Sequence, residues 1–145
     1  MYDKILIPTD GSESARQAIR EGTELAALTD AEIHGLYVVD TRDYNTLPEP
    51  KWVTLEDELE AEGETAVDLV QSEANAAGLD AVTAVTRGVP HESILEYAAD
   101  NDVDLIVMST HGRTGFDRFL VGSVTENVIR RATIPVHVVR SDPET

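Results

Sequence analysis

A glycine-rich loop between an apolar segment and an amphipathic segment holds the residues best suited to chemistry in this chain. The apolar segment, Leu105 to Met108, predicts a buried strand, and the amphipathic one begins near Gly122 and Ser123. Glycine lets a ligand approach the backbone, and a helix start offers unpaired N–H groups and a positive dipole end. From Ser109 to Arg140 there are five arginines and two acids, although the chain's formal net charge is -17. These residue types predict an anion pocket, and a nucleotide is the anion we expect.

Within that loop, the phosphate contacts are expected from Gly112, Gly122 and the Ser123 hydroxyl, with Arg113 adding a charged contact. The loop is not a Walker A loop, because GxxxxGK[ST] occurs nowhere in the chain. By spacing alone, a glycine-rich connection without a ligand fits the pattern equally well.

Two further residues have both a binding and a structural interpretation. Asp10 follows the first expected strand, where its carboxylate can accept ribose hydroxyls or hold a phosphate-bound Mg²⁺ through water. An aspartate before Gly11 is just as commonly a turn former. His111 can act as a general base or donate to phosphate, but a loop histidine more often bonds to backbone and positions a turn.

Three more polar residues receive structural interpretations. His91 directly follows Pro90 and is expected in the first turn of a helix. Arg130 and Arg131 lie near the expected end of the last helix, where cations complement the helix dipole.

The composition limits the function classes. Acids number 28 against 11 bases, of which two are lysines, Lys4 and Lys51. This balance disfavours nucleic acid and anionic membranes as partners, and we interpret it as adaptation of a halophilic protein to a high-salt cytoplasm. The chain has no cysteine, and its four histidines lack metal-ligand spacing, so we expect no metal site. No apolar run approaches the roughly 20 residues that span a bilayer, and a cytoplasmic protein is expected.

Strand and helix patterns alternate five times along the 145 residues. They predict one domain over residues 1–145, an α/β fold with an open, Rossmann-like, five-stranded parallel sheet and helices on both faces. The strands are expected at 4–9, 33–39, 81–86, 105–108 and 136–139, and the helices from Ser12, over 55–77, from Pro90 and over 122–132. Residues 40–53, with Pro48 and Pro50, predict a surface loop, and Gly88 to Pro90 a turn. A strand order of 3-2-1-4-5 brings the Asp10 turn beside the glycine-rich loop.

Three segments of the sequence resemble the universal stress protein family: 4–12, 88–91 and 108–131. The nucleotide-binding branch of that family carries G-x2-G-x9-G-[ST]. Gly112, Gly122 and Ser123 match the later positions of this motif, and Ser109 replaces its first glycine. By this resemblance, a serine side chain at that position would narrow the approach to the adenosine.

The resemblance implies a full set of nucleotide contacts. Pro8, Thr9 and Asp10 would lie beside the adenosine and ribose, Val38 would offer backbone to the adenine, and Met108 would flank it. The residues expected around the phosphates are Gly112, Arg113, Gly122, Ser123, Val124 and Thr125. The resemblance also implies a homodimer, formed through the C-terminal edge strand from Val136 to Val139. The alternative is that the tail or the charged Arg140 and Asp142 protect this edge.

These residues bind but form no recognisable catalytic set, because no nucleophile is paired with a base. We therefore expect a stress-response protein that binds ATP, with or without Mg²⁺, or another adenine nucleotide as a regulatory module, with hydrolysis slow or absent. One alternative is a slow Mg-dependent ATPase or phosphotransferase that uses Asp10 and His111. Another is a nucleotide-free interaction dimer of the same fold in which Ser109 has disabled the pocket.

Overall fold

The computed structural model describes residues 2–43, 48–110 and 121–140, and the predicted α/β fold is confirmed over them. The strands are β1 (Lys4–Pro8), β2 (Glu32–Asp40), β3 (Ala81–Gly88), β4 (Leu105–Ser109) and β5 (Val136–Val139). All pair in parallel, in the predicted order β3-β2-β1-β4-β5. The helices are α1 (Glu13–Thr29), α2 (Glu49–Ala76), α3 (Pro90–Asp100) and α4 (Ser123–Arg131), with a short 3-10 helix at Thr41–Asp43.

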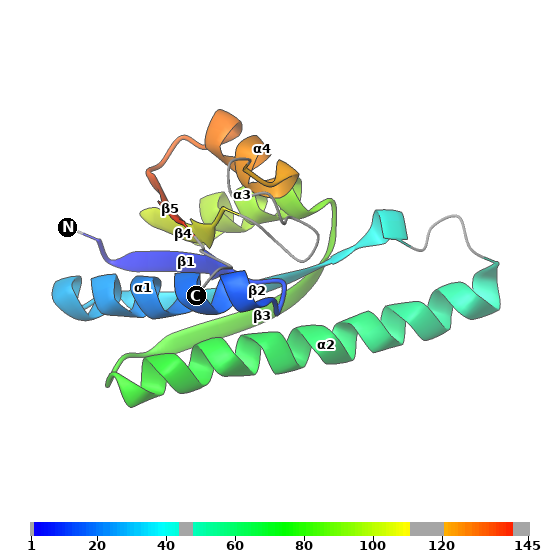
Figure 1. The fold of residues 1–145 in the computed structure, drawn as a ribbon, viewed down its shortest axis with the longest axis horizontal. Coiled ribbons are helices and arrows are strands. Elements are labelled where there is room, and N and C mark those ends of the chain that lie inside the picture. The colour runs from blue at the N-terminus through cyan, green and yellow to red at the C-terminus, as the bar shows by residue number, and fades with distance from the viewer. Residues whose placement is uncertain (1, 44–47, 111–120, 141–145) are drawn as a thin grey trace.

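The helices cover both faces of the sheet, as Figure 1 shows. One face packs on α1 and α2 through a cluster that includes Ile5, Ile7, Ile19 and Val70. The other packs on α3 and α4 through Leu6, Leu36, Ile94, Ile106 and Val128. Because β1 and β4 bury apolar side chains on both faces, they read as continuous apolar runs in the sequence.

The prediction of a loop over 40–53 is wrong for its second half. The long helix α2 begins at Glu49, preceded by Pro48, and Pro50 lies in its first turn. Proline fits a first turn because the N–H groups there have no intrahelical partner in any case. The third strand is also longer than predicted, since Gly88 closes β3 opposite Asp40 rather than starting a turn.

In the residues that the structure describes, no helix is long and apolar enough to cross a membrane.

Candidate functional site

The turn after β1 is held by short side chains that accept hydrogen bonds from backbone N–H groups two residues further along the chain. Thr9 is buried, and its N–H donates to the Leu36 carbonyl at 2.8 Å, which carries the pairing with β2 one residue past the strand. The Gly11 N–H donates to Thr9 Oγ1 at 3.1 Å, and the Ser12 N–H donates to Asp10 Oδ1 at 2.9 Å. The turn-forming interpretation of Asp10 is therefore confirmed, and its carboxylate is fixed at the carboxyl edge of the sheet.

Ser12 then starts α1 as predicted. Its hydroxyl accepts from the Ala15 N–H at 3.2 Å, which satisfies one of the unpaired groups of the first turn. Gly11 has a φ of +81°, a left-handed conformation that explains a glycine between strand and helix.

The carboxyl end of β4 is tied to the start of α4. The Thr125 hydroxyl is buried and donates to the Ser109 carbonyl at 2.8 Å, and the Gly122 N–H donates to the Thr110 carbonyl at 2.6 Å. The residue before α4 is Gly122, so no side chain caps the helix. Backbone N–H groups at the start of a helix can bind an anion.

The sheet order brings these two ends together. Leu6 of β1 is opposite Ile106 of β4, and continuing this register places Pro8 level with Met108. On the other side of β1, Pro8 is opposite Leu36, two residues before Val38. Met108 is buried, while Pro8, Asp10, Val38, Ser109, Gly122 and Val124 are half-buried and Ser123 is exposed. The predicted residues that the structure describes thus meet at one edge.

His111, Gly112 and Arg113 lie outside the described residues. Their predicted roles stay predictions.

An acid–arginine pair at this edge was missed by the sequence reasoning, which treated Asp40 only as the end of a strand. Arg42 Nε and Nη2 donate to the two carboxylate oxygens of Asp40 at 2.9 and 2.8 Å, and the Arg42 N–H donates at 3.0 Å. These hydrogen bonds from Arg42 hold the pKa of Asp40 below its ordinary value. An Asp-x-Arg spacing directly after a strand is the signal that would have suggested it.

This pair predicts a pH dependence. Because the pKa of Asp40 is lowered in the folded state, its stabilising effect is complete above the ordinary aspartate pKa of about 3.9 and is lost as the pH falls through the lower folded value. The difference in thermal midpoint between the wild type and Asp40→Asn should therefore shrink below about pH 4. A difference that stays constant between about pH 6 and pH 3 would contradict this prediction.

Two of the described histidines have side-chain partners. His34 is buried on β2, with Nδ1 at 2.7 Å from the Tyr97 hydroxyl and Nε2 at 2.7 Å from Glu32 Oε1. Burial, with a contribution from the charge of Glu32, raises the pKa of Tyr97. His137 Nε2 lies 2.5 Å from Glu21 Oε2, and His91 lies in the first turn of α3 as predicted. No cluster of potential metal ligands occurs within residues 2–43, 48–110 and 121–140.

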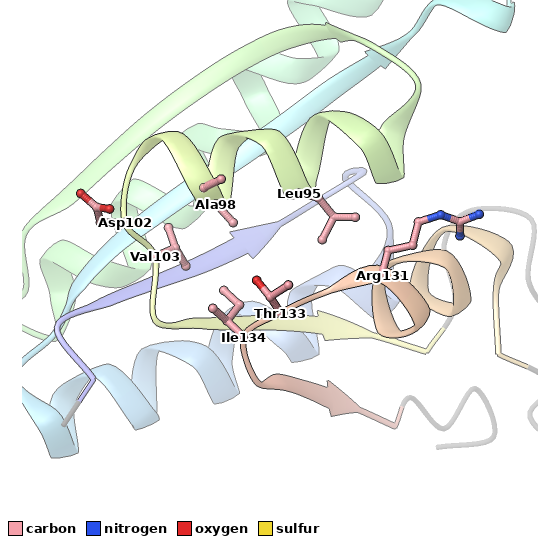
Figure 2. A pocket seen from close by; sticks show the side chains of 8 residues that line it. Leu95, Ala98, Asp102, Val103, Arg131, Thr133 and Ile134 are labelled. Carbon is pink, nitrogen blue, oxygen red and sulfur yellow. The ribbon is translucent and has the colours of Figure 1, made fainter.

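A groove of about 370 Å³ lies between α3 and the end of α4 (Figure 2). Leu95 and Ala98 of α3 line it together with Val103 and Ile134, which precede β4 and β5, and Asp102 and Arg131 stand at its two ends. Arg130 and Arg131 occupy the last turn of α4, as predicted. Arg131 donates to Asn127 Oδ1, and Arg130 Nη2 lies 3.4 Å from Glu126 Oε2. This groove contains none of the predicted nucleotide-binding residues.

The sequence and the fold both have counterparts in known proteins. The model of the universal stress protein family matches residues 1–140. The chain belongs to the universal stress protein family. Among its relatives, universal stress protein MJ0531 of Methanocaldococcus jannaschii is 41% identical over 141 residues, which cover 97% of this chain and 83% of that protein.

Solved structures of the family have the same fold. The structure of MJ0577, also from Methanocaldococcus jannaschii, superimposes with a TM-score of 0.89 at 35% identity and covers 99% of each chain. More distant members have been solved with adenine nucleotides. One is a universal stress protein in complex with cAMP, at a TM-score of 0.71 and 24% identity, covering 97% of this chain and 98% of that one. Another, from Archaeoglobus fulgidus in complex with dAMP, has a TM-score of 0.72 at 21% identity and covers 94% and 97%. At these identities the likeness concerns the fold.

Proposed function

We propose that this protein is a regulatory module of the stress response that binds ATP, or another adenine nucleotide, at the carboxyl edge of its sheet. The observation that carries the proposal is the meeting of three elements there. The Asp10 turn follows β1, Val38 lies on neighbouring β2, and the uncapped start of α4 is tied by Thr125 to the end of β4, the other neighbour of β1. The cAMP and dAMP complexes of distant family members support an adenine nucleotide as the ligand.

The proposed contacts divide into two halves. Pro8, Thr9, Val38, Met108 and Ser109 surround the adenosine, with Asp10 accepting from the ribose. Around the phosphates we place Gly112, Arg113, Gly122, Ser123, Val124 and Thr125. Backbone N–H groups and hydroxyls dominate the second half, and such donors stabilise a bound phosphate without activating a nucleophile. We therefore propose that hydrolysis is slow or absent and that Mg²⁺, where it takes part, accompanies the nucleotide.

The proposed setting is a single domain working in a salt-rich cytoplasm, as the acidic, lysine-poor composition suggests. At ~1 M salt the Debye length is about 3 Å, so the net charge of -17 repels an incoming nucleotide little. We also propose a homodimer through β5, a terminal edge strand whose Val136 and Val138 are only half-buried. A second copy would cover this edge, and the nucleotide would then act on a dimeric receptor.

The decisive measurement is equilibrium dialysis of the purified protein against ATP at about 1 M salt, with sedimentation run in parallel. We expect one ATP per chain, a dimer, and phosphate release far slower than nucleotide exchange. Absence of bound ATP and AMP would overturn the proposal. If Ser109→Gly then created binding, the nucleotide-free alternative would replace it.

Asp10→Asn separates a receptor from an enzyme. Asparagine keeps the oxygen that accepts from the Ser12 N–H, so the turn survives, but the charge is lost. We expect weaker ATP binding with no change in the slow phosphate release per bound ATP. A large fall in that release at saturating ATP, shared by His111→Ala, would favour the Mg-dependent ATPase.

A further inference from the structure

The Thr86 hydroxyl is the one side-chain polar atom that is fully covered and has no hydrogen-bond partner within the described parts of the chain. Leaving a buried hydroxyl unpaired costs free energy, and native proteins rarely retain such a group without a use for it. Valine has the same shape and would avoid this cost at a strand position.

Thr86 lies on β3 directly opposite Val38 of β2. Side chains alternate along a strand, so Thr86 shares a face with Ala84, and Ala84 and Val38 both pack on the cluster that contains Met108. The opposing pair of Thr86 and Val38 lies beyond the last β1–β2 pair, which joins Pro8 to Leu36. The hydroxyl is therefore at the carboxyl edge, on the face where the proposed adenine contacts lie.

The hydroxyl can be turned toward a ligand without moving the backbone. Thr86 as a residue is only half-buried, although its oxygen is covered. Rotation about the Cα–Cβ bond exchanges the oxygen and the methyl group between staggered positions. In its new position a hydroxyl can both donate and accept, which suits the ring nitrogens and the exocyclic amine of a purine.

We propose that the Thr86 hydroxyl is a base-recognising group, which forms a hydrogen bond to the purine ring of the bound nucleotide. This inference rests on the proposed nucleotide function. It adds a contact from β3, a strand to which the sequence reasoning assigned no binding residue. The unpaired oxygen of the free protein is then a group kept ready for the ligand.

The test compares Thr86→Val with Thr83→Val, the same change on the same strand but facing the opposite side. We expect Thr86→Val to weaken ATP binding about tenfold, the value of one net hydrogen bond, and to leave the affinity for inorganic tripolyphosphate unchanged. Without nucleotide, its thermal midpoint should equal or exceed that of the wild type. Thr86→Ser should recover most of the affinity, and Thr83→Val should bind ATP as the wild type does.

Each contrary result has a distinct meaning. Equal ATP affinity of wild type and Thr86→Val overturns this inference and leaves the proposed function standing. An equal loss in both valine variants, or a loss that extends to tripolyphosphate, also overturns it, because the effect then lies in the strand or in the phosphate half. A wild type that binds no ATP overturns the proposed function together with the inference.

Discussion

Thr125→Val is expected to lower the free energy of unfolding by about 1–3 kcal/mol and to weaken ATP binding at the same time. The Thr125 hydroxyl is buried and supplies the bond that ties the first turn of α4 to the Ser109 carbonyl at the end of β4. Valine keeps the shape but removes the donor. The carbonyl loses this partner, and the start of α4 loses its fixed position beside the proposed phosphate site.

Thr23→Val is a matched control for this change. Thr23 is also a buried threonine, but its hydroxyl donates within α1 to the Ile19 carbonyl at 2.7 Å, away from the candidate site. We expect a smaller change in its urea unfolding midpoint and unaltered ATP binding. Thr125→Ser should restore both properties. If Thr125→Val bound ATP like the wild type, the start of α4 would have no part in holding the nucleotide.

Gly35→Ala should destabilise the protein by about 1–3 kcal/mol through overpacking. A Cβ atom on Gly35 would lie 2.8 Å from Val70 Cγ1 and 2.9 Å from Val70 Cβ. Val70 is fully buried where α2 packs on β2. A β-branched side chain in a helix has one strongly preferred rotamer. The side chain cannot swing away, so the helix and the strand must separate.

Gly22→Ala provides the contrast. Its Cβ would meet Ile7 Cδ1 at 2.6 Å, the far end of a flexible side chain, and alanine in the interior of α1 gains about 1 kcal/mol of helix propensity. We expect a urea midpoint close to that of the wild type for Gly22→Ala and a clearly lower one for Gly35→Ala. Urea is preferable to guanidinium because it leaves the charge interactions of this acidic chain unscreened. The reverse order of midpoints would refute the packing argument.

The strands were predictable because apolar runs mark strands buried on both faces, and β1 and β4 are of this kind. Their order followed from a separate argument, which placed the Asp10 turn beside the glycine-rich loop at the carboxyl ends of the strands. The start of α2 was not, because Pro48 and Pro50 look like loop markers unless their place in a first helical turn is known. The position of Asp10 after the first strand suggested a binding role directly, whereas Thr125 received its role only from the resemblance to the family.

The side-chain partners depend on tertiary structure. The bond from Thr125 to Ser109 joins residues 16 positions apart, and the unpaired oxygen of Thr86 exists because of what packs around β3. No local pattern in the sequence encodes either.

The long helix α2 is unevenly attached to the molecule, and Figure 1 shows its first half extending past the sheet. Its buried residues begin at Gly63, and the described residues before that point are exposed or half-buried. Arg87 joins Glu56, at 3.3 Å, and Glu60 to the end of β3. A backbone amide exchanges its hydrogen only when the structure around it opens, and opening costs more where buried contacts must be broken. We therefore expect the first turns of α2 to exchange through local opening, and the turns from Ala66 to Ala74 to exchange only when the core itself opens. Asp40 lies beside the candidate site, and the chain that follows it leads into the end of α2 that is least protected from hydrogen exchange.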